Sequence, residues 1–499
     1  MSLKQKASDE RAGPGAKKTA GKRLKKSSDF FDPSRFRPLP PDKLFVRGLV
    51  EVQFVESARS GVEKWNFDEE QERQKFAEVW TTDLTEILGK HNLLNWRPSF
   101  PLRYPWTPKE SDRAAREAYF KDGRDKFVTF SFPREESVLD IANELRKLPE
   151  IKKAVAIPEI GPPSSPLTEP YTGTNDQVVN PCYGCLTNQW YLFRCCVPGA
   201  WAQQATGNGV VIADIDWGCN ISHDDLRLRV DTTVSRNVFP GSPNPMVVDN
   251  GRKADHGTAV LGQAGAAVND AGMAGIAFNA SLWAIQAGTD GLRDHHLWVA
   301  AINYVRTTPS TSRKVIILEI QTGGFSNIEA IPIISQEIVL AIRDQIVVCV
   351  PAGNRNTSGD AGLDDCGHPI DDTGSIVVGA TNFHPVMNQL AESNGGNRVV
   401  VYAPGDSSHD LTLALSDHDY NERFGGTSGA TAKVAGVVAL MLEKNNQLTP
   451  GQIREILKHS NKPVLDASMQ QIGVLLDANQ AVAEARGVNP LTVNCVTVN

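Results

Sequence analysis

The segment at residues 210–218 constrains the fold more than any other part of this chain. Its sequence, Val-Val-Ile-Ala-Asp-Ile-Asp-Trp-Gly, is an apolar run that ends in a carboxylate, Asp216, and a glycine. Strands buried on both faces of a parallel sheet have this composition, because helices cover both sides of such a sheet. We therefore expect a central parallel strand in an α/β domain, with Asp216 at the tip of the strand.

Two later segments each place a polar side chain at the start of a helix made of small residues. Ser428 follows two glycines and a threonine, and His256 precedes a Gly- and Ala-rich run. Glycine permits a tight backbone approach. A helix N-terminus offers free N–H groups and a partial positive charge, which suits a serine that must carry a developing oxyanion.

An aspartate at a strand tip with a histidine and a serine at helix starts is the set that a nucleophilic triad needs. The serine hydroxyl is inert near neutral pH until an imidazole takes its proton, and a carboxylate must fix the tautomer of that imidazole. In this interpretation Ser428 is the nucleophile, His256 the base and Asp216 its partner. The alternative is that these are three unrelated polar residues at the ends of separate elements.

With these segments in place, the chain resembles the subtilases, the subtilisin-like serine peptidases, over about residues 186–485. The order Asp, His, Ser along the chain is typical of that family. Residues 347–354 resemble the strand that delivers the family's oxyanion asparagine, which implies that Asn354 donates its amide to the tetrahedral intermediate beside the Ser428 N–H. The resemblance implies a subtilisin-like three-layer α/β domain with a mainly parallel sheet, and a serine endopeptidase.

The chain departs from the family pattern at several positions. Trp217 replaces a small hydroxyl residue after the catalytic aspartate, and Asp214 replaces an apolar residue. We interpret Asp214 as a supporting side chain bonded to a nearby donor. Ala432 and Lys433 replace proline and histidine after the serine. An alanine there leaves room beside an acyl-enzyme, so a transamidase or peptide ligase is an alternative, and an inactive subtilase-like binding module is a third.

The resemblance also indicates two walls of a substrate cleft. Substrate would bind by strand addition between them, although the preferred residue cannot be read from the sequence. The first wall includes Gln321, Thr322 and Gly323, and the second Pro351, Ala352 and Gly353. Glu319 is an unusual charge on the strand of the first wall, which we interpret as a core carboxylate with its bonds satisfied.

A calcium site is implied at residues 266–275, which match the family loop that surrounds this ion. Calcium favours six to eight oxygens from carboxylate, amide and backbone groups. The side chains of Asp225, Asn269 and Gln189 and the carbonyls of Ala267, Ala271 and Met273 are the expected ligands of a structural Ca2+. The alternative is an Asn-Asp-Ala-Gly turn without an ion. No organic cofactor is expected.

A second globular unit precedes the catalytic domain. Residues 44–55, 126–132 and 151–157 are expected to form strands, and 68–88 and 135–148 helices, a rhythm that suits an α+β ferredoxin-like module. The expected division is a disordered basic arm at 1–42, this module at 43–158, a linker with the processing site at 159–186 and the catalytic domain at 187–499. The module resembles a subtilase propeptide, which assists folding and inhibits in cis. The alternative is a permanent regulatory domain.

The composition limits the partners and the compartment. At 499 residues the chain can bury a large core and form two domains. A net charge of −7 argues against nucleic acid as the main partner. The resemblance to the subtilases implies a polypeptide substrate and the chain's own N-terminal domain as partners, and it allows a separate inhibitor protein. The sequence contains no apolar run of about 18 residues, so no membrane-spanning helix is expected. The missing apolar signal region predicts a cytoplasmic location or a non-classical route of secretion.

The eight cysteines allow several interpretations. Cys182, Cys185, Cys195 and Cys196 could be free, paired or bound to zinc, although their spacing fits no standard zinc pattern. Cys219 and Cys349 are expected to be small buried apolar residues.

Overall fold

The computed structural model describes residues 45–58, 60–62, 80–100, 112–161, 189–239, 254–269, 272–289, 293–355, 359–382, 389–406, 410, 412–421 and 424–490. The basic arm expected at 1–42 lies outside these residues, as does the expected linker apart from residues 159–161. The expected helix at 68–88 is described only from residue 80 onward.

A seven-stranded sheet forms the centre of the catalytic part of the chain. Its order is β13-β12-β11-β9-β6-β8-β7, and all of its pairings are parallel. The expected strand at residues 210–216 is β6, with buried neighbours on both sides, so the expectation of a mainly parallel sheet is confirmed. The strands are β6 (Val210–Asp216), β7 (Arg236–Asn237), β8 (Ser281–Gln286), β9 (Arg313–Leu318), β11 (Val347–Pro351), β12 (Ile376–Thr381) and β13 (Val399–Pro404).

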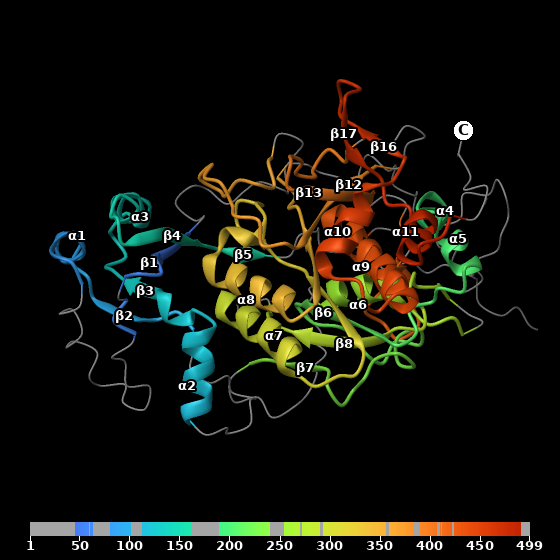
Figure 1. The fold of residues 1–499 in the computed structure, drawn as a ribbon, viewed down its shortest axis with the longest axis horizontal. Helices are drawn as coiled ribbons and strands as arrows, with labels where there is room; N and C mark the ends of the chain where they lie inside the picture. Colours follow the sequence, from blue (N-terminus) through green and yellow to red (C-terminus); the bar gives the residue numbers. More distant parts are fainter. Residues whose placement is uncertain are drawn as a thin grey trace, which may run out of the picture. The chain divides into compact units, whose positions relative to one another are not determined.

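Helices cover both faces of this sheet and give three layers (Figure 1). One face packs against α6 (Ala254–Gly265) and α9 (Gly426–Lys444), and the other against α7 (His295–Thr307) and α8 (Pro332–Arg343). The alternation of β6 divides its side chains between the two cores, with Ile212 on the α9 side and Ile215 on the α7 side. The subtilisin-like three-layer expectation is therefore confirmed.

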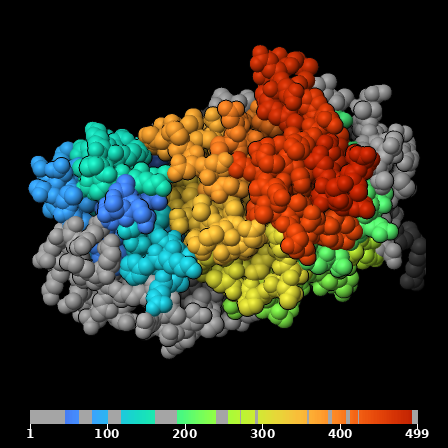
Figure 2. Space-filling view, viewed as in Figure 1, coloured from blue at the N-terminus to red at the C-terminus, as the bar shows by residue number. Residues whose placement is uncertain are grey.

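Shorter elements complete the catalytic part. The C-terminal segment, red in Figure 2, forms one continuous stretch of the surface beside the orange residues that precede it. The remaining elements are α4 (Trp190–Arg194), α5 (Val197–Ala202), β10 (Gln321–Thr322), the 3-10 helix η7 (Ile328–Ala330), β14 (Thr412–Leu413), β15 (Tyr420–Asn421), α10 (Pro450–Lys458), β16 (Pro463–Leu465), β17 (Gln471–Val474) and α11 (Ala478–Ala485).

The N-terminal part contains a four-stranded antiparallel sheet of order β2-β3-β1-β4. A βαββαβ chain with this order is ferredoxin-like. The sequence patterns located β1, β3, α3 and β4, but did not resolve β2 or α2. The elements are β1 (Phe45–Phe54), α1 (Thr82–Lys90), β2 (Asn95–Pro98), α2 (Asp112–Lys121), η6 (Arg124–Lys126), β3 (Phe127–Ser131), α3 (Val138–Leu145), β4 (Ile151–Pro158) and β5 (Ile160–Gly161).

Buried polar contacts join this sheet to helix α8. The N–H of Ile333, at the start of α8, donates to Oε1 of Glu51 on β1 at 3.1 Å. Arg124 donates to Oε1 of Glu337 on α8 at 2.5 Å. Burial raises the pKa of Glu51 to about 8, because the single backbone donor only partly offsets the lost hydration. The open N-terminus of α8 thus receives an acceptor from the N-terminal part.

The cysteines and hydropathy settle two further points. Cys196 is disulfide-bonded, whereas Cys195, Cys219 and Cys349 are buried free thiols. A disulfide sulfur is not a zinc ligand, so the four-cysteine zinc interpretation fails. The expectation of small buried residues at 219 and 349 is confirmed. Among the described residues, no helix is both long and apolar enough to cross a bilayer.

Candidate active site

Three separate elements of the catalytic part converge on one buried point. Asp216 is the last residue of β6, His256 the third residue of α6 and Ser428 the third residue of α9. Because α6 and α9 cover the same face of the sheet, their N-terminal ends can both reach the carboxyl end of β6. All three side chains are buried.

The three side chains form a continuous chain of hydrogen bonds. Nδ1 of His256 lies 2.6 Å from Oδ2 of Asp216, and Nε2 of His256 lies 3.1 Å from Oγ of Ser428. The other oxygen of Asp216 accepts the N–H of Trp217 at 2.5 Å. The backbone of Trp217 therefore keeps a bond to the carboxylate even though no hydroxyl is present at that position. This geometry lets His256 remove the proton of Ser428 while Asp216 holds the imidazole.

Asn354 lies beside the nucleophile with its amide already oriented. Oδ1 of Asn354 accepts from both the N–H and the hydroxyl of Thr427, each at 3.1 Å. Its buried Nδ2 has no hydrogen-bond partner within the described part of the chain. Gly353 has φ +97°, and a Cβ there would lie 2.3 Å from the Phe325 carbonyl oxygen, so only glycine fits before Asn354. A fixed amide with a vacant donor suits a developing oxyanion.

Thr427 is a site residue that the sequence analysis missed. Its position between Gly426 and Ser428 offered a signal, because a hydroxyl residue at a helix start commonly bonds a neighbouring polar group. The structure uses this hydroxyl to fix Asn354 rather than to cap α9.

The two predicted substrate walls are held together by their own polar side chains. Oε1 of Gln321 accepts the N–H of Asn354 at 3.0 Å, and the Thr322 hydroxyl donates to Asp365 at 2.8 Å. Both side chains are buried, so their polar groups hold the wall together. Gly323 continues from β10, while Pro351 and Ala352 are buried at the end of β11.

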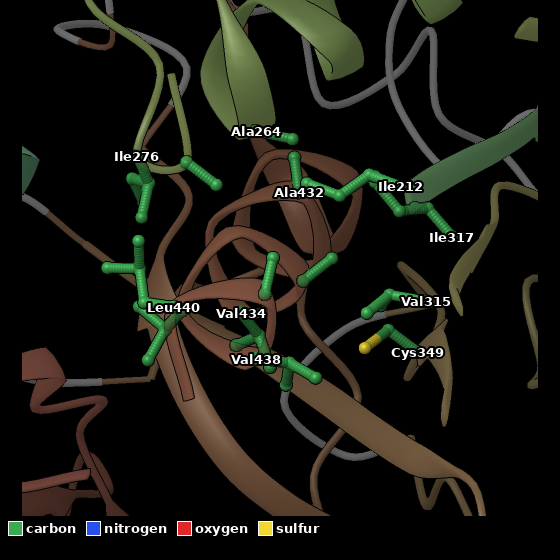
Figure 3. Packing of buried hydrophobic residues seen from close by; sticks show 14 of the residues in the cluster. Ile212, Ala264, Ile276, Val315, Ile317, Cys349, Ala432, Val434, Val438 and Leu440 are labelled. Carbon is green, nitrogen blue, oxygen red and sulfur yellow. The ribbon is translucent and has the colours of Figure 1, made fainter. Parts of the chain in front are cut away.

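The two unusual residues of α9 belong to the core. Ala432 is fully buried and packs in the same apolar cluster as Ile212 and Val434 (Figure 3). Lys433 is also buried, with Nζ 2.7 Å from Oδ2 of Asp410 and 2.9 Å from Oε1 of Gln263. The apolar surroundings of Ala432 therefore give the amine-acceptor alternative no support of their own.

Two further carboxyls near the triad, those of Asp214 and Glu319, lack among the described residues the hydrogen bonds that the sequence analysis expected for them. Asp214 was expected to bond a nearby donor, and Glu319 to have its bonds satisfied. Both are fully buried, yet no oxygen of either side chain makes a hydrogen bond of good geometry to any described residue. Burial, Asp216 and Glu319 together raise the pKa of Asp214 well above its usual range.

The residues expected to bind calcium partly converge. Oδ1 of Asp225 accepts from Nδ2 of Asn269 at 3.0 Å, and its Oδ2 accepts from the N–H of Met273 at 3.1 Å and from Tyr420 at 3.0 Å. Gln189 bonds the backbone of Ala274 next to this group. The N–H of Ala267 donates to the carbonyl of Asp225 at 2.8 Å, and Ala271 lies outside the described residues. The oxygen-rich set has calcium-like composition, but Asn269 presents its amide nitrogen and would have to turn to offer its oxygen.

Comparison with known proteins agrees with this geometry. The model of the subtilase family matches residues 207–482, which include Asp216, His256, Asn354 and Ser428. The chain belongs to the subtilase family.

Individual subtilases resemble the same region. Subtilisin E of Bacillus subtilis (strain 168) is 32% identical over 262 residues, covering 52% of this chain and 62% of that protein. An intracellular serine protease of Paenibacillus polymyxa is 32% identical over 252 residues, covering 50% and 71%. The chain thus spans 62% of the length of the first curated relatives that it matches. Fervidolysin of Fervidobacterium pennivorans, described as a keratinolytic enzyme related to subtilisin, shares the fold with TM-score 0.55 and 18% identity over 89% of this chain and 62% of its own.

Proposed function

We propose that this subtilase is a serine endopeptidase that hydrolyses peptide bonds through an acyl-enzyme on Ser428. The observation that carries the proposal is the continuous Asp216–His256–Ser428 hydrogen-bond chain beside the vacant amide donor of Asn354. The amide of Asn354, unpaired among the described residues, destabilises the fold, because a buried donor without a partner costs about 1–3 kcal/mol. A ligand that accepts this hydrogen bond, such as an oxyanion, would remove that cost.

The proposed reaction begins when Oγ of Ser428 attacks the carbonyl carbon of the scissile bond. Nε2 of His256 takes the hydroxyl proton, and Asp216 stabilises the resulting imidazolium. The negative charge on the former carbonyl oxygen is held by the Asn354 amide and the Ser428 N–H. His256 then gives its proton to the leaving amine. Water, deprotonated by His256, attacks the acyl-enzyme and releases the acid product.

A labelling experiment tests this proposal and its alternatives. A fluorophosphonate should modify the wild-type protein at Ser428 and leave Ser428→Ala unmodified. With a peptide substrate and an added amine, hydrolysis predicts free-acid products by mass, and amide products would favour a transamidase instead. A wild-type protein that is neither labelled nor active would support the inactive binding module.

We further propose that the N-terminal part acts as an intramolecular inhibitor. Its last strand, β5, pairs antiparallel with β10 on the expected substrate wall, through Ile160 opposite Thr322 and Gly161 opposite Gln321. The N–H of Gly323 also donates to the carbonyl of Glu159. An extended substrate would use the same backbone groups by strand addition. Ser428 is 0% exposed in the full-length chain, which fits a latent precursor.

Weakening this strand should make the precursor reactive. Ile160 is buried, and transferring such a side chain to water costs about 1.5–3 kcal/mol. Ile160→Asp should therefore speed fluorophosphonate labelling of the unprocessed chain by about ten-fold or more. Glu159→Ala is the matched control, because the described contact uses only its backbone carbonyl. Equal labelling rates in wild type and Ile160→Asp would argue that β5 does not guard the site.

We also propose that Asp225, Asn269 and Gln189 hold a structural Ca2+. The support is that the Asp225 carboxylate lies within hydrogen-bond distance of the Asn269 amide and of the backbone at Met273, with Gln189 bonded to the adjacent Ala274. Hard cations prefer the oxygens of such groups. The ion would supply a positive charge that replaces the protein donors now facing Asp225. It would take no part in the proposed reaction.

Calcium should raise the melting temperature of the chain. At 100 times its Kd a ligand specific to the folded state adds about 2.7 kcal/mol, which corresponds to about 4 °C for a domain of about 300 residues. The comparison uses Ser428→Ala protein, to prevent self-digestion, with calcium or with a chelator. Asp225→Asn should remove the difference. If Ser428→Ala melts at the same temperature in both solutions, residues 266–275 form a turn without an ion.

A further inference from the structure

Glu319 and two aspartates lie on the same face of the sheet as the triad. Asp214 and Asp216 are two residues apart on β6, so they share a face. The N–H of Glu319 donates to the carbonyl of Ile215 at 3.1 Å, which places Glu319 directly beyond the end of β9. Asp214 pairs in register with Ile317, and Glu319 is two residues after Ile317. Helices α6 and α9 cover this face with His256 and Ser428 at their starts.

The space around these carboxyls is closed to water. Glu319 is 0% exposed and Asp214 and Asp216 are each 1% exposed. Helix α6 seals one side, because a Cβ on Gly257 would lie 3.1 Å from Oδ2 of Asp214.

Three negative charges cannot coexist in such a space. Like charges a few ångströms apart in a dry site repel one another, so all but one carboxyl must hold a proton. Asp216 has two donors, His256 and Trp217, and therefore keeps the charge. Burial raises the pKa of Glu319 to about 8, and the opposing attractions of His256 and of the Ser428 hydroxyl are smaller.

The groups that face Glu319 come from four elements. Cys349 stays neutral because burial and Glu319 raise the pKa of its thiol. Lys433, further along α9, forms an ion pair with Asp410 and therefore does not neutralise Glu319. The facing groups are Asp214 and Asp216 on β6, His256 on α6, Ser428 on α9 and Cys349 on β11.

We propose that Glu319 belongs to the catalytic centre and that only its protonated form supports attack by Ser428. A neutral carboxyl can donate its hydrogen to Oγ of Ser428, which leaves the serine hydrogen for Nε2 of His256. A carboxylate can only accept, so an ionised Glu319 competes with His256 for that same hydrogen. No bond to substrate is formed or broken by Glu319 itself. The inference rests on the proposed hydrolase activity.

The expected result is a fall in activity on the alkaline side of the pH profile. For the wild type, kcat/KM should fall by about 100-fold between pH 7 and pH 10, with a midpoint near the pKa of Glu319, about 8, because each pH unit above that pKa lowers the protonated fraction about ten-fold. Glu319→Gln should lose this fall and stay flat within about two-fold, because glutamine donates a hydrogen at every pH. The substrate is a peptide without groups that titrate from pH 6 to 10.

Two control variants test whether the alkaline fall requires Glu319 itself or follows from the removal of any buried carboxyl. Asp214→Asn removes a neighbouring buried carboxyl that makes no hydrogen bond within the described part of the chain, and should keep the alkaline fall. Glu392→Gln removes a carboxyl whose pKa is also raised by burial, with Asp406 as its charged neighbour, and should keep the alkaline fall too.

Each outcome then bears on one claim. A fall in wild type that persists in Glu319→Gln overturns the inference, and so does a wild type whose activity is flat to pH 10. If Glu319→Gln does not fold, the fluorophosphonate labelling rate of the wild type decides, measured from pH 6 to 10 with circular dichroism as a check on folding. A rate that does not fall overturns the inference. A wild type that reacts at no pH contradicts the proposed hydrolase instead.

Discussion

Replacing Ser428 by alanine should lower kcat/KM for a peptide substrate by about 10⁵–10⁶-fold, the size established for the nucleophile of a subtilisin. Alanine keeps the backbone N–H of the oxyanion site but has no Oγ to attack the carbonyl. His256→Ala should cost about as much, because the hydroxyl then has no base 3.1 Å away. The double variant should be no worse than either single one, since the two residues act as a unit.

A second hydroxyl on α9 provides the control for this series. Thr431 is buried and donates to the carbonyl of Thr427 at 2.6 Å, one turn along the helix from Ser428. Thr431→Ser keeps that bond and should leave kcat/KM within about three-fold. Additive losses for Ser428→Ala and His256→Ala would contradict the triad.

Asn354→Ala should lower kcat by about 10²–10³-fold with little change in KM. This is the size known for the corresponding donor of a subtilisin. The amide contributes mainly when the carbonyl oxygen becomes negative, so it favours the transition state over bound substrate. Separate measurement of kcat and KM on active-site-titrated enzyme tests the prediction.

Thr427→Val refines the test of Asn354. It removes one of the two donors that hold Oδ1 of Asn354 and keeps the backbone one. A smaller loss in kcat, of about ten-fold, is expected because the amide remains present but less fixed. A change confined to KM in Asn354→Ala would show that the side chain binds substrate rather than the oxyanion.

Local patterns were sufficient to predict the centre of the fold. The apolar run of β6 has the composition of a strand buried on both faces, and the small residues of α6 and α9 allow the close packing seen in the structure. Asp216, His256 and Ser428 stand at the ends of these elements, so the topology alone brings them together.

Residues whose environment depends on lateral packing could not be predicted in the same way. Whether Glu319 finds a donor depends on which side chains of β6, α6 and α9 face the end of β9, and no short motif contains that information. The surroundings of Ala432 could not be predicted either, because α9 is buried on every side over most of its length, so a helix position gives no indication of the cleft. Tyr420 contacts Asp225 across almost 200 residues of sequence, which a loop motif does not include.

The most direct test of the account is the intact mass of the wild-type and Ser428→Ala proteins over time. If the triad is competent and the N-terminal part is a propeptide, the wild type loses about its first 160–185 residues, whereas Ser428→Ala remains full length. A wild type that stays at full length under conditions in which it hydrolyses peptides would contradict the zymogen account, and identical shortening of both proteins would show that another protease cuts them.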